Sequence, residues 1–217
     1  MNRSHDIEDY LSSQDPILGS LIRKYGPCPF LTEDSNPDLF DRLANSIIGQ
    51  QLSTKAAASI RTRILSQAGS KAFSAQFFLN VTLDNLRAYG LSRAKAKTLQ
   101  DISARIRDDH YFLIRLKELS NEEISKILCE IKGIGPWTAK MFQMFALMRQ
   151  DIFSLEDAGL MRGIRITYAL GEVIGASEIE HITNQWTPYK TIGAWYMWQV
   201  ANAQPQKLSS PRSDSKP

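Results

Sequence analysis

The stretch KGIGPWTAKM, from Lys132 to Met141, has the residue types of a phosphate-binding turn. Gly133 and Gly135 allow positive φ and carry no side chain that would hold a partner away. Pro136 suits the first position of a helix, where its missing N–H would be unpaired anyway. The remaining N–H groups at that helix end, with the positive end of the helix dipole, attract an anion. A plain turn between two helices would use the same glycines, so both interpretations stay open here.

The other reactive residue types form no comparable pattern. Cys28 and Cys129 lie far apart without metal-ligand spacing, and three histidines form no constellation. The net charge of +3 is too small to indicate nucleic acid, so a case for DNA must rest on local features. No apolar run approaches the roughly 18 residues of a membrane span. We therefore expect an intracellular protein with no membrane partner.

Helical periodicity runs through most of the chain, and no alternation is long enough to predict a sheet. Capping residues mark several helix starts: Asn36 followed by Pro37, Ser53, and the pair Ser120 and Glu123 as a capping box. The expected helices cover 36–49, 53–68, a segment from 93 through 106, 120–131, 136–148, 155–170 and 188–201. The helix after the glycine turn is apolar nearly all round, which predicts that it is buried.

The pattern around the turn, apolar-x-G-I-G-x-W-T-A, resembles the helix-hairpin-helix of the HhH-GPD DNA glycosylases. Three further stretches resemble their 3-methyladenine DNA glycosylase II branch, especially its short fungal Mag-type members. These stretches are SIIGQQLSTKAA (46–57), YGLSRAKAKTLQ (89–100) and WTPYKTIGAWYMW (186–198). The resemblance spans about residues 15–202.

This resemblance implies an all-α fold of two helical lobes with a DNA-binding cleft between them. A six-helix barrel containing the helix-hairpin-helix would form the middle lobe, at about 37–140. Residues 1–36 and 141–202 would form the second lobe. The HhH-GPD fold would then occupy 1–202, and the Ser-, Pro- and Lys-rich residues 203–217 read as a disordered tail.

The resemblance also assigns site residues. The matching catalytic carboxylate is Asp157, which would stabilise the positive charge of an oxocarbenium-like transition state. The base pocket would be formed by Trp137 and Trp198. Main-chain N–H groups would bind a DNA phosphate in the hairpin, at Gly133, Ile134, Gly135, Trp137 and Thr138. Wedge and minor-groove residues would be Gln51, Leu52 and Ser53. The family's monovalent cation, Na⁺ or K⁺, would sit on the carbonyls of Cys129, Ile131 and Ile134, with no other cofactor.

Three of these residues also have purely structural interpretations. Leu52 could be a hydrophobic staple for the helix that Ser53 caps. Trp137 could be an ordinary core residue. Asp157 could lie in the first turn of a helix whose N-cap is Ser154, which would make it less free to face a sugar. The chain also departs from the family pattern at Met141, Ala158 and Lys190.

The implied activity is excision of alkylated bases from double-stranded DNA in base-excision repair. Bifunctional relatives form a Schiff base with a lysine at the position of Trp137, so strand cleavage is not expected. The alternatives are a non-catalytic protein that binds abasic or damaged DNA, and a helical interaction module without lesion preference. The resemblance further implies a monomer, nuclear if the organism is eukaryotic.

Overall fold

The structure is a computed structural model, and it describes residues 3–31, 37–171 and 174–203. Every regular element within these ranges is a helix, which confirms the predicted all-α class. The α-helices are α1 (Arg3–Gln14), α2 (Pro16–Tyr25), α3 (Leu39–Gly49), α4 (Thr54–Ala68), α5 (Ala75–Asn80), α6 (Leu83–Ala88), α7 (Arg93–Asp108), α8 (Phe112–Arg115), α9 (Asn121–Cys129), α10 (Pro136–Phe145), α11 (Ala158–Thr167), α12 (Ala176–Asn184) and α13 (Lys190–Ala203). Two short 3₁₀ helices are η1 (Pro29–Leu31) and η2 (Leu116–Glu118).

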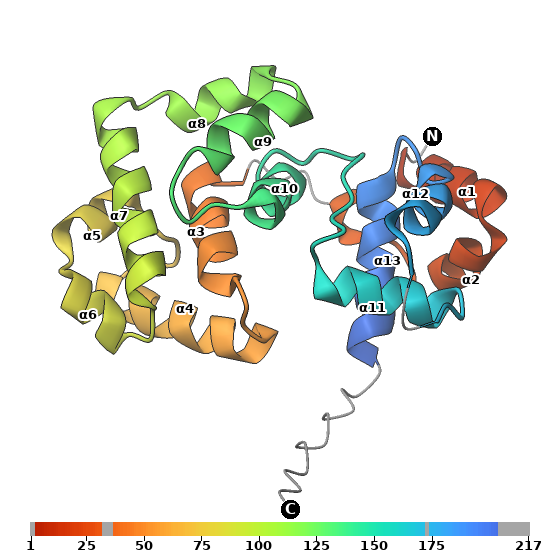
Figure 1. The fold of residues 1–217 in the computed structure, drawn as a ribbon, viewed down its shortest axis with the longest axis horizontal. Helices are drawn as coiled ribbons and strands as arrows, with labels where there is room; N and C mark the ends of the chain where they lie inside the picture. The colour runs from red at the N-terminus through yellow and green to blue at the C-terminus, as the bar shows by residue number, and fades with distance from the viewer. Residues whose placement is uncertain (1–2, 32–36, 172–173, 204–217) are drawn as a thin grey trace, which may run out of the picture.

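The helices form two groups in space (Figure 1). A separate hydrophobic cluster organises each group. We call the part built by α3 to α9 the first lobe; its cluster runs from Phe40 to Ala146. The second lobe contains α1, α2, α11, α12 and α13, and its cluster joins residues from Ile7 to Met197. The helices near the two ends of the described chain therefore pack together in one lobe. How the chain divides between domains in residue numbers stays a prediction.

Helix α10 belongs to both clusters, which explains its apolar surface. Ala139 and Phe142 pack in the first cluster, whereas Met141 and Met144 pack in the second. The helix is thus buried, as predicted, and lies where the lobes meet. It ends at Phe145 rather than Met148, because the chain turns away there and Met148 has a φ of 55°.

Helix caps follow the sequence in the first lobe, with one correction. Ser53 accepts a hydrogen bond from the Ala56 N–H, and Ser120 and Glu123 form the predicted capping box. The N-cap of α3 is Asp38, not Asn36; Asn36 lies outside the described residues. Asp38 takes this role because its carboxylate accepts from the Asp41 N–H at 2.8 Å.

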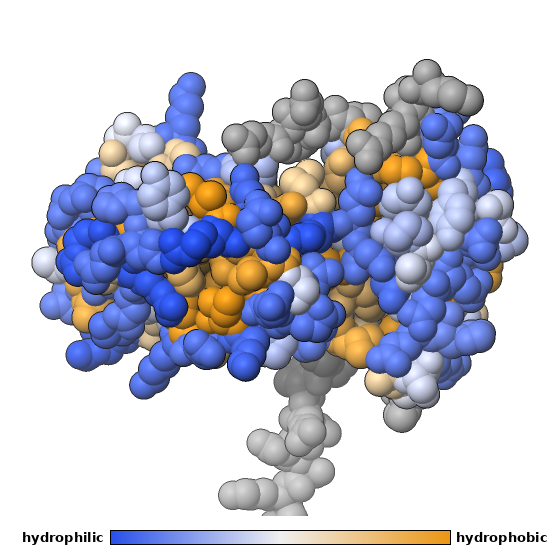
Figure 2. All heavy atoms as spheres, turned by 90° about the horizontal axis from the view of Figure 1, so that it is seen from above, coloured by the Kyte–Doolittle hydropathy of each residue, from blue (hydrophilic) through white to orange (hydrophobic). Residues whose placement is uncertain are grey.

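The surface seen from above Figure 1 has a hydrophobic area over the α8 and α9 part of the first lobe, crossed by strongly hydrophilic side chains (Figure 2). Tyr111 and Ile114, beside and within α8, are exposed to solvent. No helix in the described part of the chain is both long and apolar enough to cross a bilayer. Helix α13 includes Ala203, and the rest of the predicted tail, 204–217, lies outside the described residues.

Candidate functional site

The predicted turn joins α9 to α10, and its two glycines have different roles. Gly133 has a φ of 95°, and a β-carbon there would overlap the Thr98 hydroxyl. Gly135 has an extended backbone with φ −108° and ψ 179°, and a β-carbon there would meet nothing within 4 Å. Gly133 therefore uses the positive φ that glycine allows, whereas Gly135 does not. Its bare backbone instead leaves open space at the start of α10, where no side chain caps the first N–H groups.

Two further residues predicted in the hairpin, Ile134 and Thr138, point inward. Ile134 is buried in the first cluster, and Thr138 is buried with its hydroxyl accepting a hydrogen bond from the Gln50 side chain. Any DNA contact by these two residues must therefore use the main chain. That contact stays a prediction.

The loop between α3 and α4 carries the three predicted wedge residues. Gln51 has a φ of 55°, a conformation that non-glycine residues seldom adopt and that costs on the order of 1 kcal/mol. Leu52 is 40% exposed, which is more than a packed hydrophobic staple would be. Gln51 and Ser53 are also exposed, with Ser53 at the cap of α4. The loop thus presents an apolar and a polar side chain to the outside on a constrained backbone.

Side-chain hydrogen bonds lock this loop to the hairpin. The Gln50 amide donates to the Gly133 carbonyl at 2.9 Å and to the Thr138 hydroxyl at 2.8 Å. The Lys95 ammonium donates to the carbonyls of Ile48 and Gln50, at the negative end of the α3 dipole. Partial burial lowers the pKa of Lys95 below its ordinary value. Sequence reasoning missed Gln50 and Lys95, because their partners lie 45 to 88 residues away.

Asp157 is held by three N–H donors. The indole of Trp137 donates to Oδ2 at 2.7 Å, the indole of Trp198 to Oδ1 at 3.1 Å, and the Leu160 main chain to Oδ1 at 2.8 Å. Asp157 is itself the N-cap of α11 and is only 9% exposed. The structure thus brings together the three residues predicted for catalysis and base binding, from segments 20 and 41 residues from Asp157.

The alternative in which Ser154 caps this helix is wrong. Ser154 does not bond to Asp157 through its side chain; its hydroxyl donates to Glu156, which pairs with Lys140 at 2.9 Å. Helix α11 accordingly begins at Ala158 rather than near residue 155. Ser154 loses the role because the Asp157 carboxylate itself accepts from a free N–H in the first turn of the helix, that of Leu160.

Close packing fixes the second indole. Trp198 stacks on Phe145 with ring centroids 5.6 Å apart and 28° between the ring planes. A β-carbon on Gly159 would stand 3.0 Å from Asp157 Oδ1 and 3.2 Å from Trp198 Cδ1. The glycine two residues after the carboxylate therefore makes room for the indole that binds it. Sequence reasoning missed Gly159, since nothing local distinguishes it from other helical glycines.

A hollow of about 570 Å³ opens beside Trp137. Its apolar wall is one face of α10, formed by Trp137, Met141 and Phe145. Its polar wall comes from α3 and α4, through Asp41, Arg42, Asn45, Ser46 and Arg61. The volume is within the range of about 300–1,000 Å³ typical of small-molecule sites.

The structure places all three residues that depart from the family pattern. Met141, where an aromatic residue was expected, is buried and still lines the hollow. Ala158 is exposed directly after Asp157. Lys190 donates to the Asn184 side chain at 2.7 Å, so it ties α13 to the end of α12. The polar wall was not foreseen, because only tertiary packing brings Arg61 to α3.

Comparison with known proteins identifies relatives of this arrangement. Residues 44–189 match the profile of the HhH-GPD superfamily base excision DNA repair protein. The alkylbase DNA glycosidase-like protein mag2 of Schizosaccharomyces pombe is 29% identical, over 89% of this chain and 92% of its own length. DNA-3-methyladenine glycosylase 1 of the same yeast is 30% identical, over 89% of this chain and 86% of its own.

The fold is similar to solved structures as well. The S. pombe 3-methyladenine DNA glycosylase Mag1, solved in complex with abasic DNA, has a TM-score of 0.77 and 25% identity; the match covers 91% of this chain and 97% of that one. The DNA-3-methyladenine glycosidase of Bacillus halodurans has a TM-score of 0.71 and 31% identity, with 88% and 87% coverage.

Proposed function

Because the chain belongs to the HhH-GPD superfamily of base excision DNA repair proteins, we propose that it removes alkylated bases from double-stranded DNA. The protein binds the duplex, turns the damaged nucleotide out and hydrolyses its N-glycosidic bond. The observation that carries this proposal is the carboxylate of Asp157, held by two indoles beside a hollow large enough to admit a base. The names of its relatives, which include DNA-3-methyladenine glycosylases, support the same activity.

Asp157 acts on the sugar. As the bond from C1′ to the base nitrogen breaks, its electron pair leaves with the base and the sugar becomes oxocarbenium-like. The fixed carboxylate stabilises this positive charge, and water then attacks C1′ and loses a proton. The three N–H donors hold the carboxylate in place without reorganisation. Trp137 offers no amine for a Schiff base, so the enzyme is monofunctional.

The duplex is bound by the hairpin between α9 and α10 and by the α3–α4 loop. The bare start of α10 receives a phosphate on its N–H groups, and Leu52 fills the space that the extruded nucleotide leaves. Leu52 is suited to this because it is exposed on a loop that Gln50 and Lys95 hold rigid. We propose that one copy of the chain is sufficient for this binding.

We also propose that a monovalent cation, Na⁺ or K⁺, supports the hairpin. The carbonyls of Cys129 and Ile134 accept no hydrogen bond within the described residues, so both can face a cation. The Ile131 carbonyl accepts one bond, from the Ile134 N–H at 3.0 Å, and keeps a second lone pair. The cation would add positive charge near the phosphate. Replacing K⁺ and Na⁺ by a bulky organic cation at constant ionic strength should weaken duplex binding.

Release of free alkylpurines from methylated duplex DNA tests the activity. We expect the wild type to release them and the Asp157→Asn protein, purified in the same way, to release none above background. Absence of release by the wild type at large enzyme excess would contradict the proposal.

One observation favours a second candidate, a protein that binds abasic or damaged DNA without excising a base. Asp157 is 9% exposed and already accepts three hydrogen bonds, which limits its access to a sugar. This candidate predicts that wild type and Asp157→Asn bind abasic duplex equally and that neither releases a base. Equal affinity of the wild type for intact and abasic duplex would reject it.

A further inference from the structure

We propose that Arg42 and Ser46 read the edge of the extruded base and favour alkylated guanine over alkylated adenine. This inference rests on the proposed function and names a substrate class within it. It concerns the polar wall of the hollow, for which neither the carboxylate site nor the hairpin accounts.

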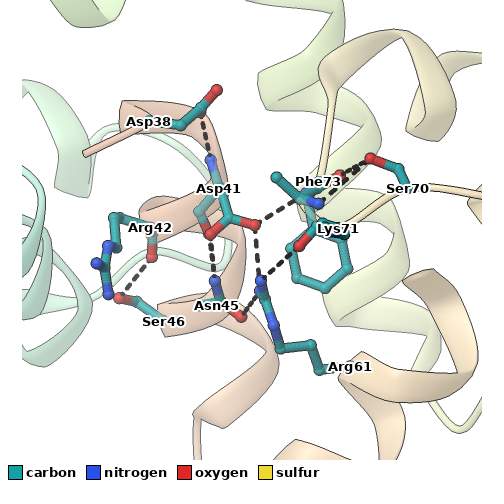
Figure 3. Close-up of polar contacts among 10 residues, drawn as sticks. Asp38, Asp41, Arg42, Asn45, Ser46, Arg61, Ser70, Lys71 and Phe73 are labelled. Atoms are coloured by element: carbon teal, nitrogen blue, oxygen red, sulfur yellow. Dashed lines mark hydrogen bonds and ion pairs between the residues drawn. The ribbon is translucent and has the colours of Figure 1, made fainter. Parts of the chain in front are cut away.

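Arg42 and Ser46 lie one turn apart on α3 and project to the same side of the helix (Figure 3). Both line the hollow, and the α10 wall with Trp137 and Phe145 lines it too. A flat ring that rests against the aromatic side chains therefore turns its edge toward α3.

The second arginine of the wall is already committed. Arg61 bonds to Asp41 at 3.1 Å, to the Asn45 amide oxygen and to the Lys71 carbonyl, and its guanidinium lies over the Phe73 ring (Figure 3). Both N–H groups of the Asn45 amide donate to Asp41. Arg61, Asp41 and Asn45 therefore hold one another in place and have few hydrogen-bond donors left for a ligand.

The guanidinium of Arg42, in contrast, makes no hydrogen bond or ion pair with any other described residue. The Ser46 hydroxyl donates its proton to the Arg42 carbonyl at 3.0 Å, so its oxygen is left as an acceptor. The wall thus offers a planar donor beside an acceptor. Arg61 is paired with Asp41 in the same wall. Asp157, which accepts a hydrogen bond from the Trp137 indole of the opposite wall, offsets the charge that Arg42 presents to a cationic base.

This pattern matches guanine. The O6 of guanine accepts from a guanidinium, and the neighbouring N1–H can donate to the Ser46 oxygen. Adenine carries an amino donor at the corresponding position, so N–H would face N–H. In N3-alkyladenine the positive charge also lies on the six-membered ring, next to Arg42. In N7-alkylguanine it lies on the other ring, away from this edge.

A single methylated duplex contains 7-methylguanine and 3-methyladenine, so one reaction measures both releases as a ratio. We expect Arg42→Ala to slow 7-methylguanine release about tenfold and 3-methyladenine release less than about twofold. Arg42→Lys should restore the charge but not the ratio, because it lacks the planar fork. Ser46→Ala should change the ratio in the same direction by about threefold. Arg107→Ala, at the far end of α7, is the matched control and should leave the ratio unchanged.

An equal fall in both releases with Arg42→Ala, or an unchanged ratio, would overturn the proposal. The first result would assign Arg42 to the DNA backbone instead. If the wild type releases neither base, the proposed excision activity fails, and base reading is tested without it. Free 7-methylguanine and 3-methyladenine are then titrated into the complex with abasic duplex. Tighter binding of 7-methylguanine that is lost in Arg42→Ala supports base reading, and equal binding of the two bases overturns it.

Discussion

The region proposed to hold DNA and the region proposed to do chemistry are built by opposite rules. In the hairpin and the α3–α4 loop, polar side chains turn inward to fix the backbone: Gln50, Lys95 and Thr98 all bond to main-chain carbonyls. Around Asp157, side chains from three elements converge on one carboxylate. A backbone surface suits a ligand that must be held regardless of sequence, whereas a converging side-chain site suits one reacting atom.

The largest expected effect separates the two hairpin glycines. Gly133→Ala introduces strain at φ 95° and a clash with Thr98, so the free energy of unfolding should fall by about 2–4 kcal/mol. Gly135→Ala has space and an ordinary backbone, so it should change stability by less than about 0.5 kcal/mol. Chemical denaturation measures both. Equal destabilisation by the two substitutions would mean that the hairpin backbone is not held as described.

A substitution beside the carboxylate should disturb chemistry without loosening the grip on DNA. Gly159→Ala pushes on Asp157 and Trp198, and we expect the single-turnover excision rate to fall about tenfold while abasic-duplex affinity stays within about twofold. Gly175→Ala is the control, because a β-carbon there would meet only the Ser177 hydroxyl, at 3.7 Å. An unchanged rate in Gly159→Ala would argue that the Trp198 contact does not matter for excision.

The exposed wedge should act on lesion recognition rather than on general affinity. Leu52→Ala removes most of the apolar side chain, and the preference for abasic over intact duplex should fall about fivefold. Competition binding with the two duplexes measures this preference. If affinity for both duplexes fell equally, Leu52 would be an ordinary surface contact.

The smallest effect is expected for Lys95, which does not face the ligand but supports the α3–α4 loop through hydrogen bonds to its main chain. Lys95→Met removes the bonds to Ile48 and Gln50, and should reduce the same preference about threefold. Lys97→Met, two residues away on the same helix, removes only an exposed pair with Asp101 and should have no effect. Lys95→Arg should recover part of the loss. If Lys97→Met lost as much of the preference as Lys95→Met, the hydrogen bonds of Lys95 to the loop would not explain the effect.

Much of the fold could be predicted, because capping and periodicity are local. Ser53, Ser120 and Glu123 cap the helices that they were expected to cap, and the apolar stripes mark buried faces. The errors lie at ends that tertiary contacts decide. Asp157 replaces Ser154 as a cap in a place where two indoles also bind it.

The candidate site also contains residues that could be predicted from the sequence and residues that could not. Asp157, Trp137 and Trp198 were found through their resemblance to a family, and the structure joins them. Gln50 and Arg61 carry no local signal, since a glutamine after a helix and an arginine within one are common surface residues. Their roles exist only once α3, α4 and α10 have packed together.

The central claim is that DNA binding and base excision depend on different parts of the molecule. Asp157→Asn and Gly135→Ala test it most directly in one experiment. For each variant, abasic-duplex affinity and the excision rate at saturating enzyme are measured together. Asp157→Asn should lower the saturated rate at least about 100-fold and leave affinity within about twofold. Gly135→Ala should weaken affinity and leave the saturated rate nearly unchanged. Parallel losses of rate and affinity in both variants would contradict the account.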